Sequence, residues 1–375
     1  MPHGYTSGLP LALWSESIIK HMQTLYPHHL KGLSRRDFLK LSGAALLSLF
    51  LSPFDFQSTT QQGNHNFEAE LSSGRILENK VTLYDRPSFS GKVLKMYWKD
   101  LVLPITAVTI GDSEPAHNRI WYEINHEGYV HSGSVQPVKV SLNPILDMIP
   151  DTGQLVEVTV PYTDAVWSPW RPGSTAYRLY YGTTYWVKKV VVDEKGKFWY
   201  RILDDHWGYY YYADATHLKP ITPNELRPFS SSVKPEEKRL EVHLSEQVVV
   251  AYEADSPVFI TRVSTGARFS DGDFRTQRGR FMTNRKRPSR HMTTGDHAAP
   301  NSYDLPGVPW VCYLTRSGVS FHGTFWHNDF GKPRSHGCIN CSIPAARWIY
   351  RWTDPVVPHD KEYLSDKIGT QVDVI

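Results

Sequence analysis

The stretch that decides the fold lies near the carboxyl terminus and reads Phe321-His322-Gly323-Thr324, then, after a short spacer, Ser335-His336-Gly337-Cys338-Ile339-Asn340. A reactive cysteine needs a base, because at an ordinary pKa near ~8.5 only a small part of a thiol is ionised at neutral pH. His322 and His336 are both candidates. His336 precedes Cys338 by two positions, whereas His322 reaches it only through folding. The pattern indicates nucleophilic cysteine chemistry.

Two other interpretations of these residues stay open. His322, His336, Cys338 and Cys341 could hold zinc, since Cys338 and Cys341 have C-x-x-C spacing. The two cysteines could instead form a redox dithiol. A structural zinc site usually has a second ligand pair, and redox pairs usually begin a helix in a βαβ pattern; the sequence has neither feature. Acyl transfer by Cys338 is favoured.

The motif resembles the signature of the L,D-transpeptidases with a YkuD-type catalytic domain. That signature is His-Gly, a spacer, then Ser/Thr-His-Gly-Cys, an apolar residue and Arg or Asn, and every position is matched. The resemblance covers about residues 239–375 and implies a β-sandwich catalytic domain at 237–375. It implies a cysteine acyltransferase that makes 3→3 cross-links between peptidoglycan stem peptides, without a metal or organic cofactor.

The resemblance also implies catalytic roles. Cys338 is expected to be the nucleophile that takes the acyl group from a donor stem, and His322 the general base. The carbonyl of Gly323 is expected to orient that imidazole in place of the third member of a triad. His336 matches a position beside the reacting groups.

Four further positions are expected to form the oxyanion and substrate-binding part of the site. Because Gly337 has no side chain, the N–H groups of Gly337 and Cys338 can approach a developing oxyanion. Ser335 and Asn340 match positions that shape the site, and Tyr303 matches a tyrosine that adds a hydroxyl to the oxyanion site.

The sequence departs from the family pattern in places. A common Thr-Pro-x-Gly-x-Phe segment appears here as Thr276-Gln277-Arg278-Gly279-Arg280-Phe281, without the proline. Cys341 is outside the signature, and a small buried residue is favoured over a resolving thiol. The basic run Arg285-Lys286-Arg287-Pro288-Ser289-Arg290 could attract donor carboxylates or stay a solvated loop.

The motif leaves two other functions open. An L,D-carboxypeptidase would use water as the acceptor with the same residues, and a wall-binding protein would carry an inert catalytic domain. Carbapenem-type β-lactams, whose strained amide mimics the donor, are expected inhibitors. No nucleic-acid partner is expected, because 41 Lys+Arg against 38 Asp+Glu give a net charge of only +3.

Two related β-rich segments precede the motif, at 74–138 (module 1) and 150–220 (module 2). Trp121-Tyr122-Glu123-Ile124 in the first is echoed by Trp199-Tyr200-Arg201-Ile202 in the second, which suggests an internal duplication. Both resemble bacterial SH3-like β-barrels. Their aromatic residues, which include Trp167, Trp170, Trp207 and 209–212, either bind wall glycan or fill the barrel cores. Residues 221–236 are expected to be a flexible linker, so the catalytic domain should act independently of both modules.

The amino terminus resembles a twin-arginine export signal. Ser34-Arg35-Arg36-Asp37-Phe38-Leu39-Lys40 precedes an apolar stretch that is shorter than the roughly 20 residues of a spanning helix. Residues 1–57 are therefore expected to direct export to the cell wall or periplasm, and residues 58–73 to be a linker.

The whole composition agrees with a globular, mainly β protein. The 375 residues are 40% hydrophobic and 21% charged, which disfavours bulk disorder and a polytopic membrane protein. Aromatic residues make up 13%, and 26 prolines and 25 glycines supply frequent turns, a mixture that favours short strands over long helices.

Overall fold

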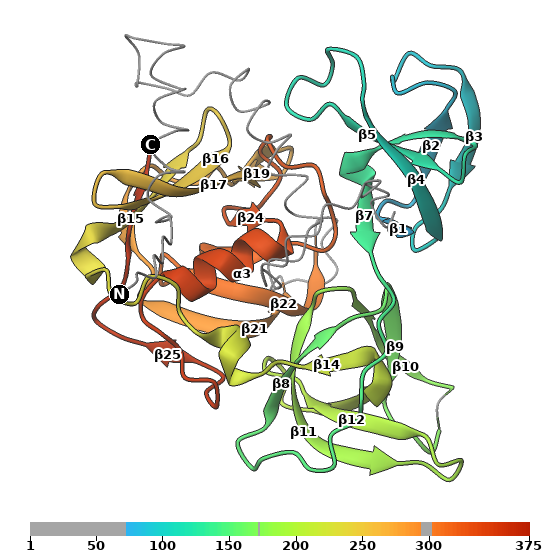
Figure 1. Ribbon diagram of the computed structural model, residues 1–375, viewed down its shortest axis with the longest axis vertical. Helices are drawn as coiled ribbons and strands as arrows, with labels where there is room; N and C mark the ends of the chain where they lie inside the picture. The colour runs from blue at the N-terminus through green and yellow to red at the C-terminus, as the bar shows by residue number, and fades with distance from the viewer. Residues whose placement is uncertain (1–72, 172, 294–301) are drawn as a thin grey trace, which may run out of the picture. The chain divides into compact units, whose positions relative to one another are not determined.

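The computed structural model describes residues 73–171, 173–293 and 302–375 (Figure 1). The expected export signal at 1–57 and nearly all of the linker at 58–73 lie outside the described residues. Strands dominate the described ranges, so the mainly β fold class is confirmed. None of the described helices is long and apolar enough to cross a membrane.

Module 1 forms a seven-stranded sheet in the order β3-β2-β6-β5-β4-β1-β7. In β2 buried and half-buried residues alternate, so that Val81 and Leu83 face the core. The strands are β1 (Ser73–Ile76), β2 (Val81–Tyr84), β3 (Val93–Tyr97), β4 (Val102–Ile110), β5 (Ile120–Ile124), β6 (Gly128–His131) and β7 (Val135–Val138).

Module 2 repeats this arrangement in the order β10-β9-β13-β12-β11-β8-β14. Each strand has the place of its counterpart in module 1, and Trp121 and Trp199 lie on the matching strands β5 and β12. An internal duplication accounts for this identity of strand order. The strands are β8 (Gln154–Val158), β9 (Tyr162–Val166), β10 (Thr175–Tyr180), β11 (Thr184–Val192), β12 (Phe198–Leu203), β13 (Tyr210–Asp214) and β14 (Leu218–Pro220).

The aromatic residues of module 2 divide between its core and its surface. Tyr211 is buried in the core of the module, whereas Trp167, Trp170 and Trp207 are exposed. Some of these aromatic residues therefore fill the core, and others are exposed where a glycan could contact them. The identification of the modules as SH3-like stays a prediction.

The remaining chain forms a ten-stranded sheet in the order β20-β26-β15-β16-β17-β24-β23-β22-β21-β25. Two of its pairs are parallel, β15 with β26 and β23 with β24. A separate hairpin contains β18 (Arg268–Phe269) and β19 (Gly272–Asp273). The sheet strands are β15 (Lys238–His243), β16 (Val248–Glu253), β17 (Ser256–Ser264), β20 (Gly279–Met282), β21 (Arg285–Thr293), β22 (Asp304–Tyr313), β23 (Ser320–Gly323), β24 (Ile339–Cys341), β25 (Leu364–Ser365) and β26 (Gln371–Val374).

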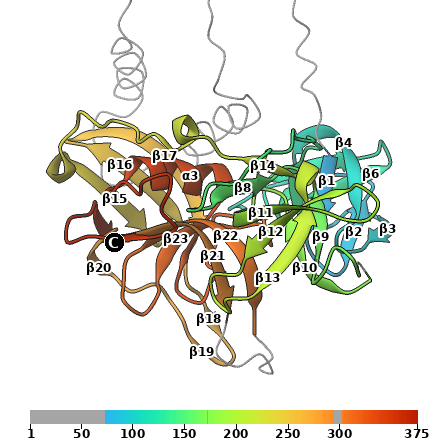
Figure 2. The ribbon, with the colours of Figure 1, turned by 90° about the horizontal axis from the view of Figure 1, so that it is seen from below.

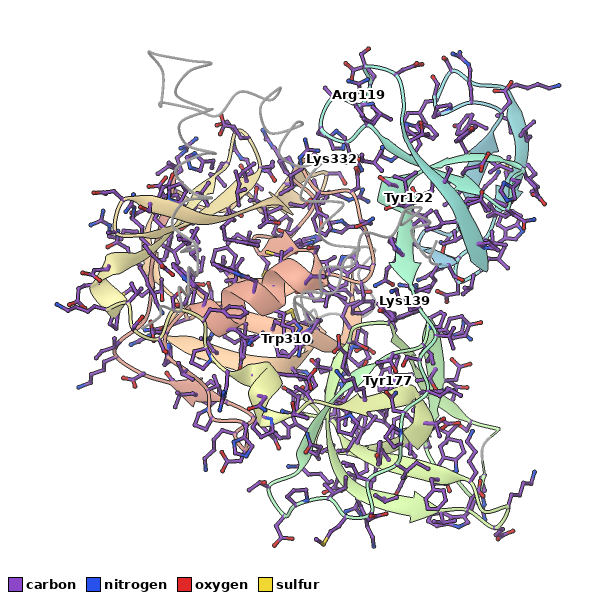
Figure 3. All side chains as sticks on the ribbon, in the orientation of Figure 1. Arg119, Tyr122, Lys139, Tyr177, Trp310 and Lys332 are labelled. Atoms are coloured by element: carbon purple, nitrogen blue, oxygen red, sulfur yellow. The ribbon has the colours of Figure 1, made fainter. Side chains whose placement is uncertain are left out.

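A single well-formed helix in the described chain, α3 (Ile343–Trp352), covers this sheet. The Ser342 side chain caps its first turn, and its apolar face is buried in the core. At its carboxyl end the buried Lys286 ammonium donates to the carbonyls of Tyr350 and Thr353, both at 2.6 Å. Trp310 of β22 packs against the Tyr350 ring at 5.4 Å between centroids (Figure 3). The basic run seen in the sequence therefore includes a buried lysine.

The segment expected to be a flexible linker, 221–236, lies against α3. Phe229 stacks on Trp348 with 6.0 Å between ring centroids, and the Arg351 guanidinium lies 3.9 Å from the Phe229 ring centre. Ile221 also joins the hydrophobic core of the third sheet. Contacts along its length thus hold this segment to the domain that follows it.

Candidate active site

The parallel strands β23 and β24 bring the two halves of the motif together. Their register sets His322 opposite Asn340 and Phe321 opposite Ile339. Because side chains alternate along a strand and paired residues face the same way, the two strands have a polar face and an apolar face. The polar face carries Ser320, His322, Cys338 and Asn340, and the apolar face carries Phe321, Gly323, Ile339 and Cys341. Figure 2 shows α3 on one side of β23 and the β18–β19 hairpin on the other.

The apolar face is part of the core beneath α3. Phe321, Ile339 and Cys341 are fully buried there. A Cβ added to Gly323 would lie 2.8 Å from the Pro309 ring, so this position has no room for a side chain. Burial raises the pKa of the Cys341 thiol well above its ordinary value.

This geometry excludes the two alternatives built on the C-x-x-C spacing. Cys341 faces the core while Cys338 and His322 face the other side, so these residues cannot converge on one metal ion or pair as a dithiol. Cys312, Cys338 and Cys341 are all free thiols.

The polar face holds the Cys338 thiol beside Ser320. The sulfur lies 3.7 Å from the Ser320 hydroxyl and 3.8 Å from the Gly318 carbonyl, to which the thiol donates. Burial raises the pKa of this thiol, and the hydrogen bond with Ser320 opposes the rise only in part. The resting group is therefore a neutral thiol at pH 7. Ser320 was missed by sequence reasoning, although its place two residues before His322 puts it on the same face of a strand.

His322 lies on the same face and is oriented by its neighbour. Its Nδ1 is 3.2 Å from the Gly323 carbonyl, which can only accept, so Nδ1 carries the proton and Nε2 keeps a lone pair. The ring is 2% exposed, and burial lowers its pKa to about 4. His322 is thus neutral at pH 7. Among the described residues no hydrogen bond joins the resting imidazole to the Cys338 thiol, so any proton transfer needs a small approach of the two groups.

The turn before Cys338 is held by hydroxyl groups. The Ser335 hydroxyl donates to the Cys338 carbonyl at 2.5 Å and accepts from the Gly337 N–H at 3.1 Å. The Gly337 N–H, which was expected to face an oxyanion, thus donates to the Ser335 hydroxyl in this structure, and its part in an oxyanion site stays a prediction. Thr276, which lies in the segment that departs from the family's Thr-Pro-x-Gly-x-Phe pattern, donates to the Gly337 carbonyl at 2.8 Å. Ser335 and Thr276 thus fix the turn that carries Cys338, and a direct contact of Ser335 with substrate stays a prediction.

The second candidate base, His336, lies among aromatic rings. It is exposed and stacks on Phe269, with Phe274 also 4.7 Å away and Tyr303 at 6.2 Å between centroids. Burial and the nearby Cys338 raise the pKa of the Tyr303 phenol. Tyr303 therefore stays protonated close to the thiol, as a hydroxyl donor to an oxyanion would.

His327 and Trp326 border the site and were missed by sequence reasoning. The Asn340 amide donates to His327 Nε2 at 3.0 Å, and burial lowers the His327 pKa to about 3. Within the described chain the other polar atoms of this pair, Nδ1 of His327 and Oδ1 of Asn340, have no partner. The Trp326 ring is 5.7 Å from that of His322. Both residues lie in the spacer of the motif, where no periodic pattern marks them.

The comparisons with known proteins identify the domain that carries these residues. Residues 237–374 match the model of the YkuD family, the L,D-transpeptidase catalytic domain, so this segment is a YkuD-type catalytic domain. No curated protein matches the chain.

Parts of several solved structures are similar to the chain. An L,D-transpeptidase from Mycobacterium smegmatis is 24% identical, with 37% of this chain and 58% of that chain covered and a TM-score of 0.31. L,D-transpeptidase 3 from Mycobacterium tuberculosis, in complex with a faropenem-derived adduct, is 20% identical, with 37% and 60% covered and a TM-score of 0.30. The catalytic domain of an Enterococcus faecium L,D-transpeptidase is 21% identical, with 37% and 98% covered and a TM-score of 0.29. This chain thus spans less than two thirds of the length of the first two.

Proposed function

We propose that the protein is a peptidoglycan L,D-transpeptidase that forms 3→3 cross-links through an acyl-enzyme on Cys338. The observation that carries the proposal is the shared polar face of β23 and β24, where an oriented neutral imidazole and a buried thiol lie on adjacent strands of a YkuD-type domain. Neither group needs a metal to act as base or nucleophile.

The first half-reaction acylates Cys338. As the sulfur attacks the amide carbonyl after the L-centre of a tetrapeptide donor, the S–H proton moves to His322 Nε2. The oxyanion receives hydrogen bonds from the Cys338 N–H and the Tyr303 hydroxyl, since the Gly337 N–H is occupied. The C–N bond then breaks, His322 returns the proton to the leaving amine, and the terminal D-residue departs from a thioester.

The second half-reaction transfers the acyl group. An amine of an acceptor stem attacks the thioester carbonyl and gives a proton to His322. The C–S bond breaks, the new amide is released, and the proton returns to the Cys338 thiolate. If water takes the place of the amine, the same residues trim the donor, which is the L,D-carboxypeptidase alternative.

A neutral resting pair suits this chemistry. The raised pKa of the thiol and the lowered pKa of His322 both oppose formation of a thiolate–imidazolium pair before substrate binds. A thiol kept in this form is less open to oxidation than a thiolate, which favours survival outside the cytoplasm. We accordingly propose that residues 1–57 direct export and that the exposed tryptophans of module 2 contact wall glycan.

Purified protein incubated with tetrapeptide muropeptides, and analysed by mass spectrometry, tests the proposal. A dimer with a 3→3 link, absent with the Cys338→Ala variant, is the expected product. A shortened monomer alone would replace transpeptidation by carboxypeptidase activity. Unchanged muropeptides, from protein that is folded, would support the inert wall-binding function instead.

A further inference from the structure

The loop of residues 324–335 joins the two halves of the active site. It starts directly after His322 and Gly323 and ends at the turn that holds Cys338. Inside it, Trp326 lies beside the His322 ring and His327 bonds to Asn340. A displacement of this loop would therefore change the surroundings of the proposed base and nucleophile together.

Module 1 holds the middle of this loop through Asn328. The Asn328 backbone N–H donates to the Gly133 carbonyl at 3.0 Å, and its side-chain amide donates to the carbonyls of Ser132 and Val135 at 3.2 and 3.1 Å. The Asn328 side chain also lies close to the phenol of Tyr122, a buried residue of module 1 (labelled in Figure 3) whose pKa burial raises. Backbone and side chain of one loop residue are thus both fixed by module 1.

The next residue, Asp329, joins the module to the end of the loop. Its buried carboxylate accepts from His117 of module 1 at 2.8 Å, from Lys332 at 2.6 Å and from Arg334 at 2.9 Å. Burial alone would raise the pKa of Asp329, but the hydrogen bonds and charges of His117 and Lys332 hold it well below its ordinary value. The loop also packs tightly here, because a Cβ on Gly133 would lie 2.7 Å from the Asp329 Cβ.

A buried arginine of module 1 holds the start of the loop. Arg75 on β1 donates from Nη2 to the Phe325 carbonyl at 2.6 Å, while its Nε donates to Gln136 and its Nη1 to Asp100 inside the module. The guanidinium is 1% exposed, so these hydrogen bonds lie in a region of low dielectric, where they are strong. Module 1 therefore contacts the loop at its start, at its middle and through the carboxylate that binds Arg334.

We propose that module 1 is a positioning part of the active site, and that Asn328 and His117 are positioning residues that set the place of the 324–335 loop beside Cys338. The inference rests on the proposed function of Cys338 and adds a role for a module that the sequence suggests is an independent wall-binding unit. A loop without these bonds would sample many conformations, and small misplacements near reacting groups reduce rates strongly.

Matched substitutions in the full-length protein test this inference. Asn328→Ala removes the side-chain bonds to Ser132 and Val135 and leaves the backbone bond to Gly133. Asn143→Ala is the control: its amide donates to the carbonyls of Ser141 and Thr216 at 3.3 and 3.1 Å, away from the loop. His117→Ala approaches the loop from the module side and removes the imidazole that donates to Asp329; this side chain is 21% exposed.

The rate of carbapenem acylation at Cys338, followed by intact-protein mass, is expected to fall about tenfold for Asn328→Ala. A smaller fall is expected for His117→Ala, and the Asn143→Ala rate should stay within about twofold of the parent. Since both residues act through one loop, the double variant Asn328→Ala/His117→Ala should lose less than the product of the single losses. The acid limb of the pH–rate profile should move upward for Asn328→Ala, because water that reaches His322 relieves the burial that lowers its pKa.

Hydrogen exchange of a peptide covering 324–335 separates this inference from the proposed function. Faster exchange of this peptide in Asn328→Ala, but not in Asn143→Ala, would support the positioning role. This holds even if the parent protein is not acylated, because absence of acylation would refute only the proposed function. Equal acylation and equal exchange for Asn328→Ala and Asn143→Ala would overturn the inference while the function stands. The inference would also be overturned if the acylation rate of each variant fell only by the fraction of that variant that is unfolded.

Discussion

The two faces of the β23–β24 pair differ in chemistry although the same two short strands form both. On one face Cys338 has a hydroxyl, a carbonyl and, two residues along the partner strand, an imidazole on the same side. On the other face Cys341 is enclosed by the core beneath α3. Both thiols have a pKa raised by burial. What separates the proposed nucleophile from the structural thiol is therefore the presence of a proposed base and of oriented polar groups on its face, not its own ionisation.

The largest expected difference in activity is between the cysteine-to-alanine substitutions on the two faces. Cys338→Ala should abolish formation of a carbapenem adduct and of any muropeptide product, because the other two thiols, Cys312 and Cys341, are buried in the hydrophobic core. The thermal midpoint should stay close to that of the parent, since Cys338 is outside the core. Intact-protein mass and a thermal melt measure the two outcomes. An adduct on folded Cys338→Ala protein would place the nucleophile elsewhere.

Removal of the base is expected to have the next largest effect. His322→Gln keeps a side chain of similar reach but cannot take a proton at neutral pH, so the acylation rate should fall by about 10²–10⁴. His336→Gln is the matched control, because His336 stacks on Phe269 and has no bond to the thiol among the described residues. Stopped-time acylation assays compare the two. A larger loss for His336→Gln would exchange the roles of the two histidines.

How far the sequence leads depends on how local each contact is. The motif spacing predicts Cys338, His322 and the Gly323 carbonyl, because a short signature on two paired strands carries them. The mainly β fold follows from turn-rich, aromatic segments. Ser320 could have been found as well, since alternation along a strand places it on the face of His322.

The rest depends on contacts between distant parts of the chain. The Thr276–Gly337 bond joins residues 61 positions apart, and Asn328 is fixed by carbonyls of another module. No periodicity marks such pairs, because loops that are ordered by tertiary contacts have no pattern of their own. The same limit applies at Gly337, where freedom from a side chain is evident in the sequence but the bond from its N–H to the Ser335 hydroxyl is not.

A smaller effect on activity is expected on the apolar face. Cys341→Ala should leave the carbapenem acylation rate within about threefold of the parent, because its side chain points away from the thiol and the imidazole. It should lower the free energy of unfolding by about 1–2 kcal/mol, since a fully buried sulfur is removed from the core. Denaturant titration and acylation of the same sample measure both. Loss of acylation as complete as for Cys338→Ala would revive the dithiol interpretation.

The smallest effect on the acylation rate is expected from a moderate fall in pH. His322 must be neutral to accept the thiol proton, and burial lowers its pKa to about 4, so most of the imidazole is still neutral at pH 5. The acylation rate should therefore change less than about twofold between pH 7 and pH 5, whereas a base with the ordinary pKa of about 6.5 would lose more than about tenfold. The rate should fall only as the pH approaches 4. At alkaline pH the rate should rise, because burial raises the pKa of the Cys338 thiol and thiolate forms only as the pH approaches that raised pKa. His336, which is exposed, serves as the internal comparison: if His336→Gln removes the acid limb of the profile and His322→Gln keeps it, the exposed ring supplies the proton acceptor and the polar face of β23 does not.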